Sequence, residues 1–238
     1  KMAIQDGTPH LSSAEALIRW QHPELGMISP GHFIPLFEEN GMIRKLDRYV
    51  WKEAARQVAA WKEKYGITIP VSVNISRMDI YDPNLEIELL NNVHNAGIEP
   101  SDYLLEITES AYTDNSDQII RVVDRLRSDG FRIEMDDFGS GYSSLNMLTI
   151  LPIDALKLDM KFVQNILRDN KEYRMVELMM EIAEFLSVPV IAEGVEDENQ
   201  YRLLKDAGCD IIQGYYFSKP LPIEEMTNII MEKKDEIG

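Results

Sequence analysis

Cysteine is scarce in this 238-residue sequence, and long apolar segments are absent. The single cysteine, Cys209, cannot form a disulfide within the chain, so a reducing, cytosolic compartment is the default expectation. Cys209 lies in the apolar context AGCDII, where we expect it to pack in the core. We find neither a signal peptide nor an apolar run of about 18 residues, and we therefore expect no membrane insertion by this segment.

Basic residues are also few. Lysine and arginine number 24 against 41 aspartate and glutamate residues, which gives a formal net charge of −17. Nucleic-acid polymers and anionic membranes bind to basic surfaces, so these partners are disfavoured. The charge does not exclude a small anionic ligand held by metal ions, because the local field then belongs to the ions.

Motifs for zinc and for dinucleotides are missing. The sequence has neither CxxC nor HxxxH, and its four histidines are expected in loops or on helices, away from strand ends: His10, His22, His32 and His94. Zinc is therefore disfavoured. No GxGxxG follows the first expected strand, which removes the usual signature of an open, doubly wound sheet.

Short apolar runs alternate with helical periodicity about eight times along the chain. Strands are expected at residues 1–5, 13–20, 69–75, 103–108, 131–135, 155–159, 188–192 and 210–212. Helices are expected at residues 32–39, 43–65, 83–95, 115–128, 143–148, 161–168, 173–186, 198–206 and 223–234, with loops at 6–9 and 21–31. At this length the alternation predicts an α/β fold, a TIM-like (β/α)₈ barrel, with the doubly wound sheet as the alternative. No linker or repeat divides the chain, so residues 1–238 are expected to form a single domain.

Residues 131–145, FRIEMDDFGSGYSSL, contain the most informative local pattern. An apolar strand ends in the adjacent carboxylates Asp136 and Asp137, and a glycine-rich turn follows with Gly139 and Gly141. Adjacent carboxylates repel and raise each other's pKa unless a cation lies between them, and oxygen ligands suit Mg²⁺ or Mn²⁺. A plain solvated turn remains the alternative for this pair taken alone.

Polar side chains recur at the ends of the other expected strands, where barrels build their sites. They are Glu15, Asn74, Glu106, Lys157, Asp159, Glu193, Glu196 and Gln213, with Glu109 just beyond Glu106. One lysine cannot balance so many carboxylates, whereas two divalent cations can, and such a pair of ions supports phosphodiester hydrolysis. Individually, Glu106 and Lys157 can also be read as a salt bridge, Asn74 as a helix cap and Glu193 as a turn residue.

These residues occur in a series of motifs that resembles the EAL domain family, bacterial phosphodiesterases that act on cyclic di-GMP. The motifs are EALIRW (15–20), FIPLFEENG (33–41), VNIS (73–76), LEITES (105–110), DDFGSGYSSL (136–145), LKLD (156–159), IAEGVE (191–196) and QGYYFSKPL (213–221). The resemblance implies a TIM-like barrel whose first strand often runs antiparallel. It also implies hydrolysis of cyclic di-GMP to linear pGpG with two Mg²⁺ or Mn²⁺ ions.

The resemblance further implies roles for individual residues. Glu15, Asn74, Glu106 and Asp136 would hold one metal, and Asp136 and Asp137 the second. Glu193 would be the candidate general base, Lys157 would contact the water or phosphate, and Leu17, Arg19 and Gln213 would contact or shape the substrate site. Residues 137–144 resemble a loop that couples metal binding to dimerisation, anchored by Glu109, and Asp159 and Glu196 would support the site from a second layer.

Two departures from the family pattern matter. Phe37-Glu38-Glu39 stands where Ala-Glu-Glu is common, which we interpret as a packing difference. A Tyr-Gln-Pro motif expected just before Lys1 is not in the sequence, so the first strand would be incomplete or the chain would be a fragment of a multidomain protein with an upstream GGDEF or sensor domain. A catalytically silent cyclic di-GMP receptor and a hydrolase of another phosphodiester remain as alternatives.

Overall fold

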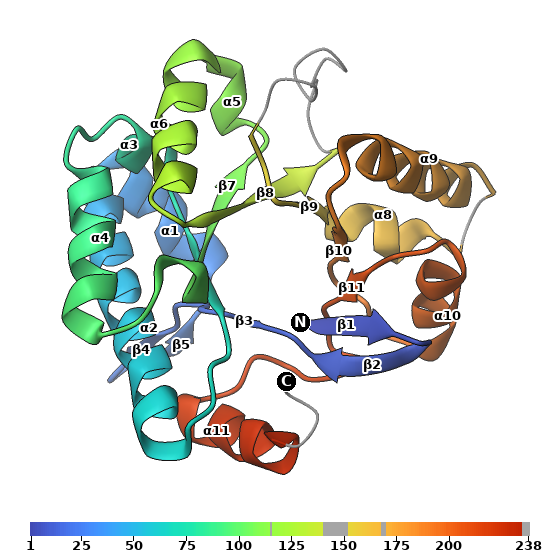
Figure 1. Cartoon of the computed structure of the whole chain (residues 1–238), viewed down its shortest axis with the longest axis horizontal. Helices are drawn as coiled ribbons and strands as arrows, with labels where there is room; N and C mark the ends of the chain where they lie inside the picture. Colours follow the sequence, from blue (N-terminus) through green and yellow to red (C-terminus); the bar gives the residue numbers. More distant parts are fainter. Residues whose placement is uncertain (115, 140–151, 168–169, 235–238) are drawn as a thin grey trace.

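Figure 1 shows the computed structural model, which describes residues 1–114, 116–139, 152–167 and 170–234. Nine strands form one sheet in the order β2-β1-β11-β10-β9-β8-β7-β6-β3. Their bounds are β1 Met2–Gln5, β2 Thr8–Leu11, β3 Ala14–Glu15, β6 Val71–Asn74, β7 Tyr103–Thr108, β8 Arg132–Phe138, β9 Ala155–Leu158, β10 Val190–Ala192 and β11 Ile211–Ile212. A separate hairpin pairs β4 (Trp20–His22) with β5 (Gly26–Ile28).

The sheet curls so that its two ends meet. β2 and β3 are the outermost strands in the sheet order, yet only Ser12 and Ser13 separate them in the chain. The amino group of Lys1 donates to the Ser13 carbonyl at 2.9 Å, and the Ser12 amide donates to the Lys1 carbonyl at 3.0 Å. The outermost strands are thus covalently continuous, which gives a barrel and makes the open doubly wound alternative wrong.

Strand direction also agrees with the expected barrel. β1 is antiparallel to both of its neighbours, β2 and β11. The pairs from β3 through β6, β7, β8, β9 and β10 to β11 are all parallel. The expectation of an antiparallel first strand is confirmed.

Helices surround the ring of strands (Figure 1). Their bounds are α1 Pro30–Glu39, α2 Ile43–Tyr65, α3 Arg77–Ile80, α4 Leu85–Ala96, α5 Ala111–Asp114, α6 Ser116–Ser128, α8 Met160–Asn165, α9 Asn170–Leu186, α10 Glu198–Asp206 and α11 Ile223–Glu232, with a 3₁₀ turn at Pro100–Asp102. α2 has the predicted bounds because Trp51, Val58 and Trp61 recur on one buried face and Gly66 ends the helix in the left-handed conformation. β7 and α10 also coincide with their predicted bounds.

The prediction of one strand over residues 13–20 was wrong. Only Ala14 and Glu15 pair with β6, and the chain then leaves the sheet. Trp20 instead begins the β4–β5 hairpin, and its ring packs against Phe33 and Phe37 of α1. The ring centroids are 5.6 Å and 5.9 Å apart, respectively. Aromatic contacts with a neighbouring helix thus outweigh the strand propensity of this segment.

Several smaller expectations also need correction. The loops expected at 6–9 and 21–31 contain the start of β2, the β4–β5 hairpin and the start of α1, so His10 and His22 lie in strands. β8 continues through Asp136 and Asp137 to Phe138 instead of ending at residue 135. The helix expected at 143–148 falls outside the described residues.

Alternation along the strands separates two environments. Val73, Leu105, Ile133, Leu156 and other residues of the same parity belong to the buried apolar cluster that includes residues of the surrounding helices. The intervening side chains face the interior of the ring, because they contact one another across it, as described below. Cys209 is buried in the apolar cluster, as expected, and burial raises the pKa of its thiol to about 12. Among the described residues no helix combines the length and apolarity needed to cross a bilayer.

Candidate active site

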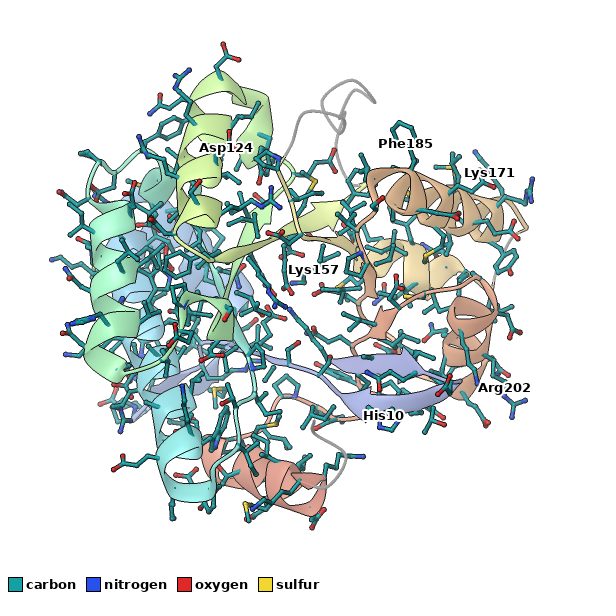
Figure 2. All side chains as sticks on the ribbon, in the orientation of Figure 1. His10, Asp124, Lys157, Lys171, Phe185 and Arg202 are labelled. Carbon is teal, nitrogen blue, oxygen red and sulfur yellow. The ribbon has the colours of Figure 1, made fainter. Side chains whose placement is uncertain are left out.

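The ammonium group of Lys157 lies at the centre of a buried carboxylate cluster. Its Nζ atom is 2.7 Å from Glu106 Oε2, 2.7 Å from Glu193 Oε1, 3.3 Å from Asp136 Oδ1 and 3.9 Å from Glu15 Oε2. Lys157 lies within the ring of strands in Figure 2. Residues from β3, β7, β8, β9 and the end of β10 therefore meet inside one end of the barrel, as the sequence predicted.

Glu106 is the most enclosed carboxylate of the cluster, with 1% of its surface exposed. Its Oε1 atom accepts hydrogen bonds from Ser72 Oγ at 2.6 Å and from Lys1 Nζ at 2.8 Å. Burial by itself would raise the pKa of this carboxyl, but Lys157 and Lys1 bring it well below the usual range. Glu106 is therefore ionised at neutral pH.

Glu193 and Glu15 behave differently. Burial raises the pKa of Glu193 to about 8 although Lys157 opposes the shift, and the nearby Asp136 adds to it. Burial and the charge of Glu106 also raise the pKa of Glu15, whose Oε2 accepts a 2.7 Å hydrogen bond from Gln213 Nε2. One lysine does not fully offset the carboxylates around it, in agreement with the argument from sequence.

The Asp136-Asp137 pair lies in an irregular part of β8. The register with β9 shifts between Met135 and Phe138, and Asp137 takes a positive φ of 56°. Asp136 Oδ1 accepts the Asp137 amide at 2.9 Å, and Asp137 is exposed. Partial burial of the Asp137 carboxyl within this otherwise exposed residue, together with repulsion by Asp136, raises the pKa of Asp137. Lys157 lies 3.3 Å from Asp136 Oδ1, and the charges of Lys157 and Lys161 only partly offset the upward shift at Asp137.

Glu109 connects to the end of this segment. Its Oε2 accepts the Gly139 amide at 2.8 Å, and its own amide donates to the Asp136 carbonyl at 2.8 Å. Glu109 thus contacts the last described residue of the segment that it was expected to anchor. Gly141, expected to belong to the same loop, lies outside the described residues.

The other expected site residues lie around the cluster in different environments. Asn74 is exposed at the end of β6, in register with Glu106. Leu17 and Arg19 are exposed in the segment after β3, open to a ligand. Asp159 is an N-cap that accepts the Lys161 amide at 2.8 Å. Glu196 is exposed just before α10, where its amide donates to Gln200 Oε1 at 2.7 Å.

Three buried polar residues inside the ring, Ser72, Glu134 and Lys1, were not predicted from the sequence. Ser72 and Glu134 each stand two positions before an expected ligand, Asn74 and Asp136 respectively, so strand alternation places them on the same face. That spacing was a usable signal. Lys1, whose ammonium bonds Ser72 at 2.9 Å and also pairs with Glu134, carries no such signal in the sequence.

The cluster suits hard divalent cations by its donor chemistry. Among the described residues, five carboxylates lie around the side-chain ammonium groups of Lys1 and Lys157: Glu15, Glu106, Glu134, Asp136 and Glu193. Glu106 Oε2 and Glu193 Oε1 both lie 2.7 Å from the same Lys157 ammonium, and within the described part of the chain Gln213 Oε1 is buried without a hydrogen bond. All available ligands are oxygens, as Mg²⁺ and Mn²⁺ prefer. The carboxylates surround Lys157. Among the described residues, no group of three or more His, Cys, Asp or Glu side chains is already arranged to hold a metal ion.

A separate hollow of about 700 Å³ lies at the opposite end of the sheet, lined by α9, α10 and the first residue of β10. Its lining includes Glu177, Glu181, Glu184 and Asp206. Asp210 at its edge already accepts the Val190 amide at 2.8 Å. We assign it no part in the chemistry, because it faces the amino ends of the strands.

The model of the EAL domain family matches residues 3–220. The chain belongs to the EAL domain family. Among curated relatives of this EAL domain, the cyclic di-GMP phosphodiesterase NbdA of Pseudomonas aeruginosa is 37% identical over 229 residues, which is 96% of this chain and 29% of NbdA. The cyclic di-GMP phosphodiesterase PdeR of Escherichia coli is 39% identical over 210 residues, covering 88% of this chain and 32% of PdeR.

Solved structures of EAL proteins have the same fold. The EAL domain superposes on the PaMucR phosphodiesterase in complex with c-di-GMP with a TM-score of 0.86 and 35% identity, over 89% of this chain and 86% of that one. The recognised family and the observed barrel agree with the fold predicted from the motifs. The curated relatives are about three times as long as the chain, so they contain further regions outside this alignment.

Proposed function

We propose that this EAL domain hydrolyses one phosphodiester bond of cyclic di-GMP to give linear pGpG. The observation that supports this most directly is the convergence of Glu15, Glu106, Asp136 and Glu193 on Lys157 at the carboxyl ends of the strands. The relatives NbdA and PdeR, named as cyclic di-GMP phosphodiesterases, support the choice of substrate.

Two divalent cations, Mg²⁺ or Mn²⁺, are part of the proposal. Glu15, Asn74, Glu106 and Asp136 would hold one ion, and Asp136 and Asp137 would hold the other. When bound, such ions supply a stronger nucleophile at neutral pH and offset the charge that develops on the phosphate oxygens.

The chain's own groups manage the proton and the phosphate. We assign Glu193 as general base, because it directly follows β10 at the carboxyl end of the barrel and its Oε1 atom lies 2.7 Å from the Lys157 ammonium, among the carboxylates of the cluster. The oxygen of the attacking water bonds to phosphorus, its proton passes to Glu193, and the bond from phosphorus to the 3′ oxygen breaks. Lys157, 2.7 Å from Glu193 Oε1, donates to the water or to a phosphate oxygen and keeps Glu193 directed at the reaction. Solvent protonates the leaving 3′ oxygen.

Substrate recognition is assigned to residues at the rim. Leu17 and Arg19 are exposed beside Glu15, where an apolar side chain and a guanidinium can meet a base and a phosphate. Gln213 holds Glu15 through its Nε2 and thereby shapes the same rim.

The experiment is incubation of the purified chain with cyclic di-GMP and Mn²⁺, followed by chromatography. We expect pGpG, and we expect none from Glu15→Gln. Binding of cyclic di-GMP without product would instead identify a silent receptor. Parallel reactions with cyclic di-AMP and a nitrophenyl phosphodiester would reveal a hydrolase of another substrate.

The wider context is also proposed. We expect a homodimer formed near residues 137–144, and a longer cytoplasmic protein in which a GGDEF or sensor domain precedes this single domain of residues 1–238. The length of the relatives and the diguanylate cyclase activity in the name of the relative MucR support an upstream partner domain. The net charge of −17 makes a nucleic-acid polymer an unlikely ligand compared with a cyclic dinucleotide.

A further inference from the structure

A second charged layer lies inside the barrel beneath the carboxylate cluster. Glu134 is in register with Glu106 and stands two residues before Asp136, so it lies one inward step closer to the amino ends of the strands. Lys1 extends from the beginning of β1 into this layer, and its ammonium contacts Glu106, Glu134 and Ser72. The side chains of Lys1 and Glu106 are fully buried, and that of Glu134 is 7% exposed.

Packing alone does not account for this layer. Barrel interiors are ordinarily filled by branched apolar side chains, and replacing a buried ion pair by apolar residues is often neutral or stabilising. Glu106 provides a specific partner for the pair. Its Oε1 accepts hydrogen bonds from Lys1 and Ser72 of the inner layer, while its Oε2 lies 2.7 Å from the Lys157 ammonium in the cluster.

We infer that Lys1 and Glu134 are positioning residues that hold Glu106 for cation binding. This inference deepens the proposed function and rests on it for the identity of the site. Lys1 fixes Glu106 through Oε1, so that Oε2 points into the cluster. Glu134 shares the ammonium group of Lys1 with Glu106, so that Lys1 neutralises less of the negative charge that Glu106 presents to a divalent cation.

The opposite charges of Glu134 and Lys1 predict an order of Mn²⁺ affinities among variants. Glu134→Gln leaves Lys1 to pair with Glu106 alone, which withdraws charge from the cluster. Mn²⁺ affinity should fall about tenfold, the lower end of the effect of losing a group that orients a metal ligand. Adding Lys1→Met to Glu134→Gln removes both charges, so the double variant should bind Mn²⁺ more tightly than Glu134→Gln. A purely structural role predicts the reverse, because the second substitution then adds damage.

The experiment is isothermal titration of the folded chain with Mn²⁺ at pH 8, with the melting temperature of each variant followed by circular dichroism. Asp154→Asn is the matched control: Asp154 binds Arg127 and the Ile133 amide at the other end of the same sheet. It should lower the melting temperature and leave Mn²⁺ affinity unchanged. If Glu134→Gln does not melt cooperatively, Glu134→Met takes its place in the titration. Methionine removes the same charge and introduces no buried amide that needs hydrogen bonds.

Unchanged Mn²⁺ affinity in Glu134→Gln, or a double variant that binds no more tightly, overturns the inference. The proposed function is tested separately, by measuring pGpG formation with the unmodified chain. Product formation with no effect of Glu134→Gln on Mn²⁺ binding rejects the positioning role alone. The predicted affinity order without any product supports the positioning role and rejects the phosphodiesterase.

Discussion

At the scale of the residue, neighbouring carboxylates in one motif have different environments. Glu193 and Glu196 both belong to IAEGVE, yet Glu193 lies 2.7 Å from Lys157 while Glu196 is exposed. The difference arises because Glu193 directly follows β10, whereas Glu196 lies three residues further on, just before the N-cap Asp197 of α10. Residue type and motif membership therefore do not determine a role without position on the strand.

Glu193→Gln tests the assignment of the general base. The amide keeps the shape of the side chain but cannot accept the proton, so kcat should fall about 10²- to 10⁴-fold while the Kd for cyclic di-GMP changes little. Steady-state kinetics with Mg²⁺ and a binding titration measure the two quantities. Glu198→Gln, an exposed change on α10, should leave both unchanged, and near-normal turnover of Glu193→Gln would refute the role of Glu193.

Asp47 is a buried acid outside the proposed site. It lies on α2 opposite Asp79 of α3, and burial, with a hydrogen bond and repulsion from Asp79, raises the pKa of Asp47 to about 9. The unfolded chain has a carboxyl pKa of about 3.9, so the folded state binds more protons between these values. The stabilisation is complete below the lower value and is lost as pH rises towards 9.

Asp47→Asn should therefore reduce the decrease in the free energy of unfolding that occurs as the pH rises from 6 to 9. Urea unfolding at pH 6 and pH 9 should give the unmodified chain a larger drop in unfolding free energy than the variant, by about 1 kcal/mol or more, since one pKa unit corresponds to about 1.4 kcal/mol. Asp124→Asn, an exposed position on α6 labelled in Figure 2, is the control and should not alter the drop. Equal drops in Asp47→Asn and the unmodified chain would contradict the assigned protonation.

At the scale of the element, the end of β8 combines an irregular strand with a tight turn. The register shift beyond Met135 and the positive φ of Asp137 direct both aspartates towards the cluster end of the barrel. Gly139 then adopts a φ of 89°, and a Cβ atom at this position would lie 2.7 Å from the Phe162 ring. Glycine is required here for both its backbone conformation and its small size.

Gly139→Ala should lower the free energy of unfolding by about 2–4 kcal/mol, because backbone strain and overlap with Phe162 add. Gly130→Ala is a matched control, with a φ of 98° but only ordinary contact, 3.4 Å, with Pro100. It should cost about 1–2 kcal/mol from backbone strain alone. Urea denaturation of both variants measures the difference, and equal losses would show that the Phe162 contact is relieved without cost.

Secondary structure was predictable where one periodicity dominated. The buried stripe of α2 and the apolar run of β7 gave correct bounds, because local pattern and tertiary packing demand the same conformation there. Residues 13–20 failed because their conformation depends on partners remote in sequence. Ala14 pairs with Val71, and Trp20 packs on Phe33 and Phe37.

At the scale of the whole molecule, closure of the ring creates the site. Gln213 and Glu15 are 198 residues apart, and they meet at 2.7 Å only because the last strand returns beside the first. The same closure brings Lys1 to Glu134 across the interior. Contacts of this kind depend on topology, so no local sequence pattern determines them.

The sequence alone determined the family, the barrel and most of the carboxylates, because strand-end positions in a parallel barrel converge whatever the details of packing. Its lack of cysteine and histidine motifs also led to the prediction that any metal ligands would be oxygen atoms. The tertiary structure alone decided that Lys157 is the centre of the cluster and that Lys1 and Glu134 form a layer beneath it. The physical reason is that charge balance inside the barrel depends on which side chains share one enclosed space of low polarity, and only the folded ring defines that space.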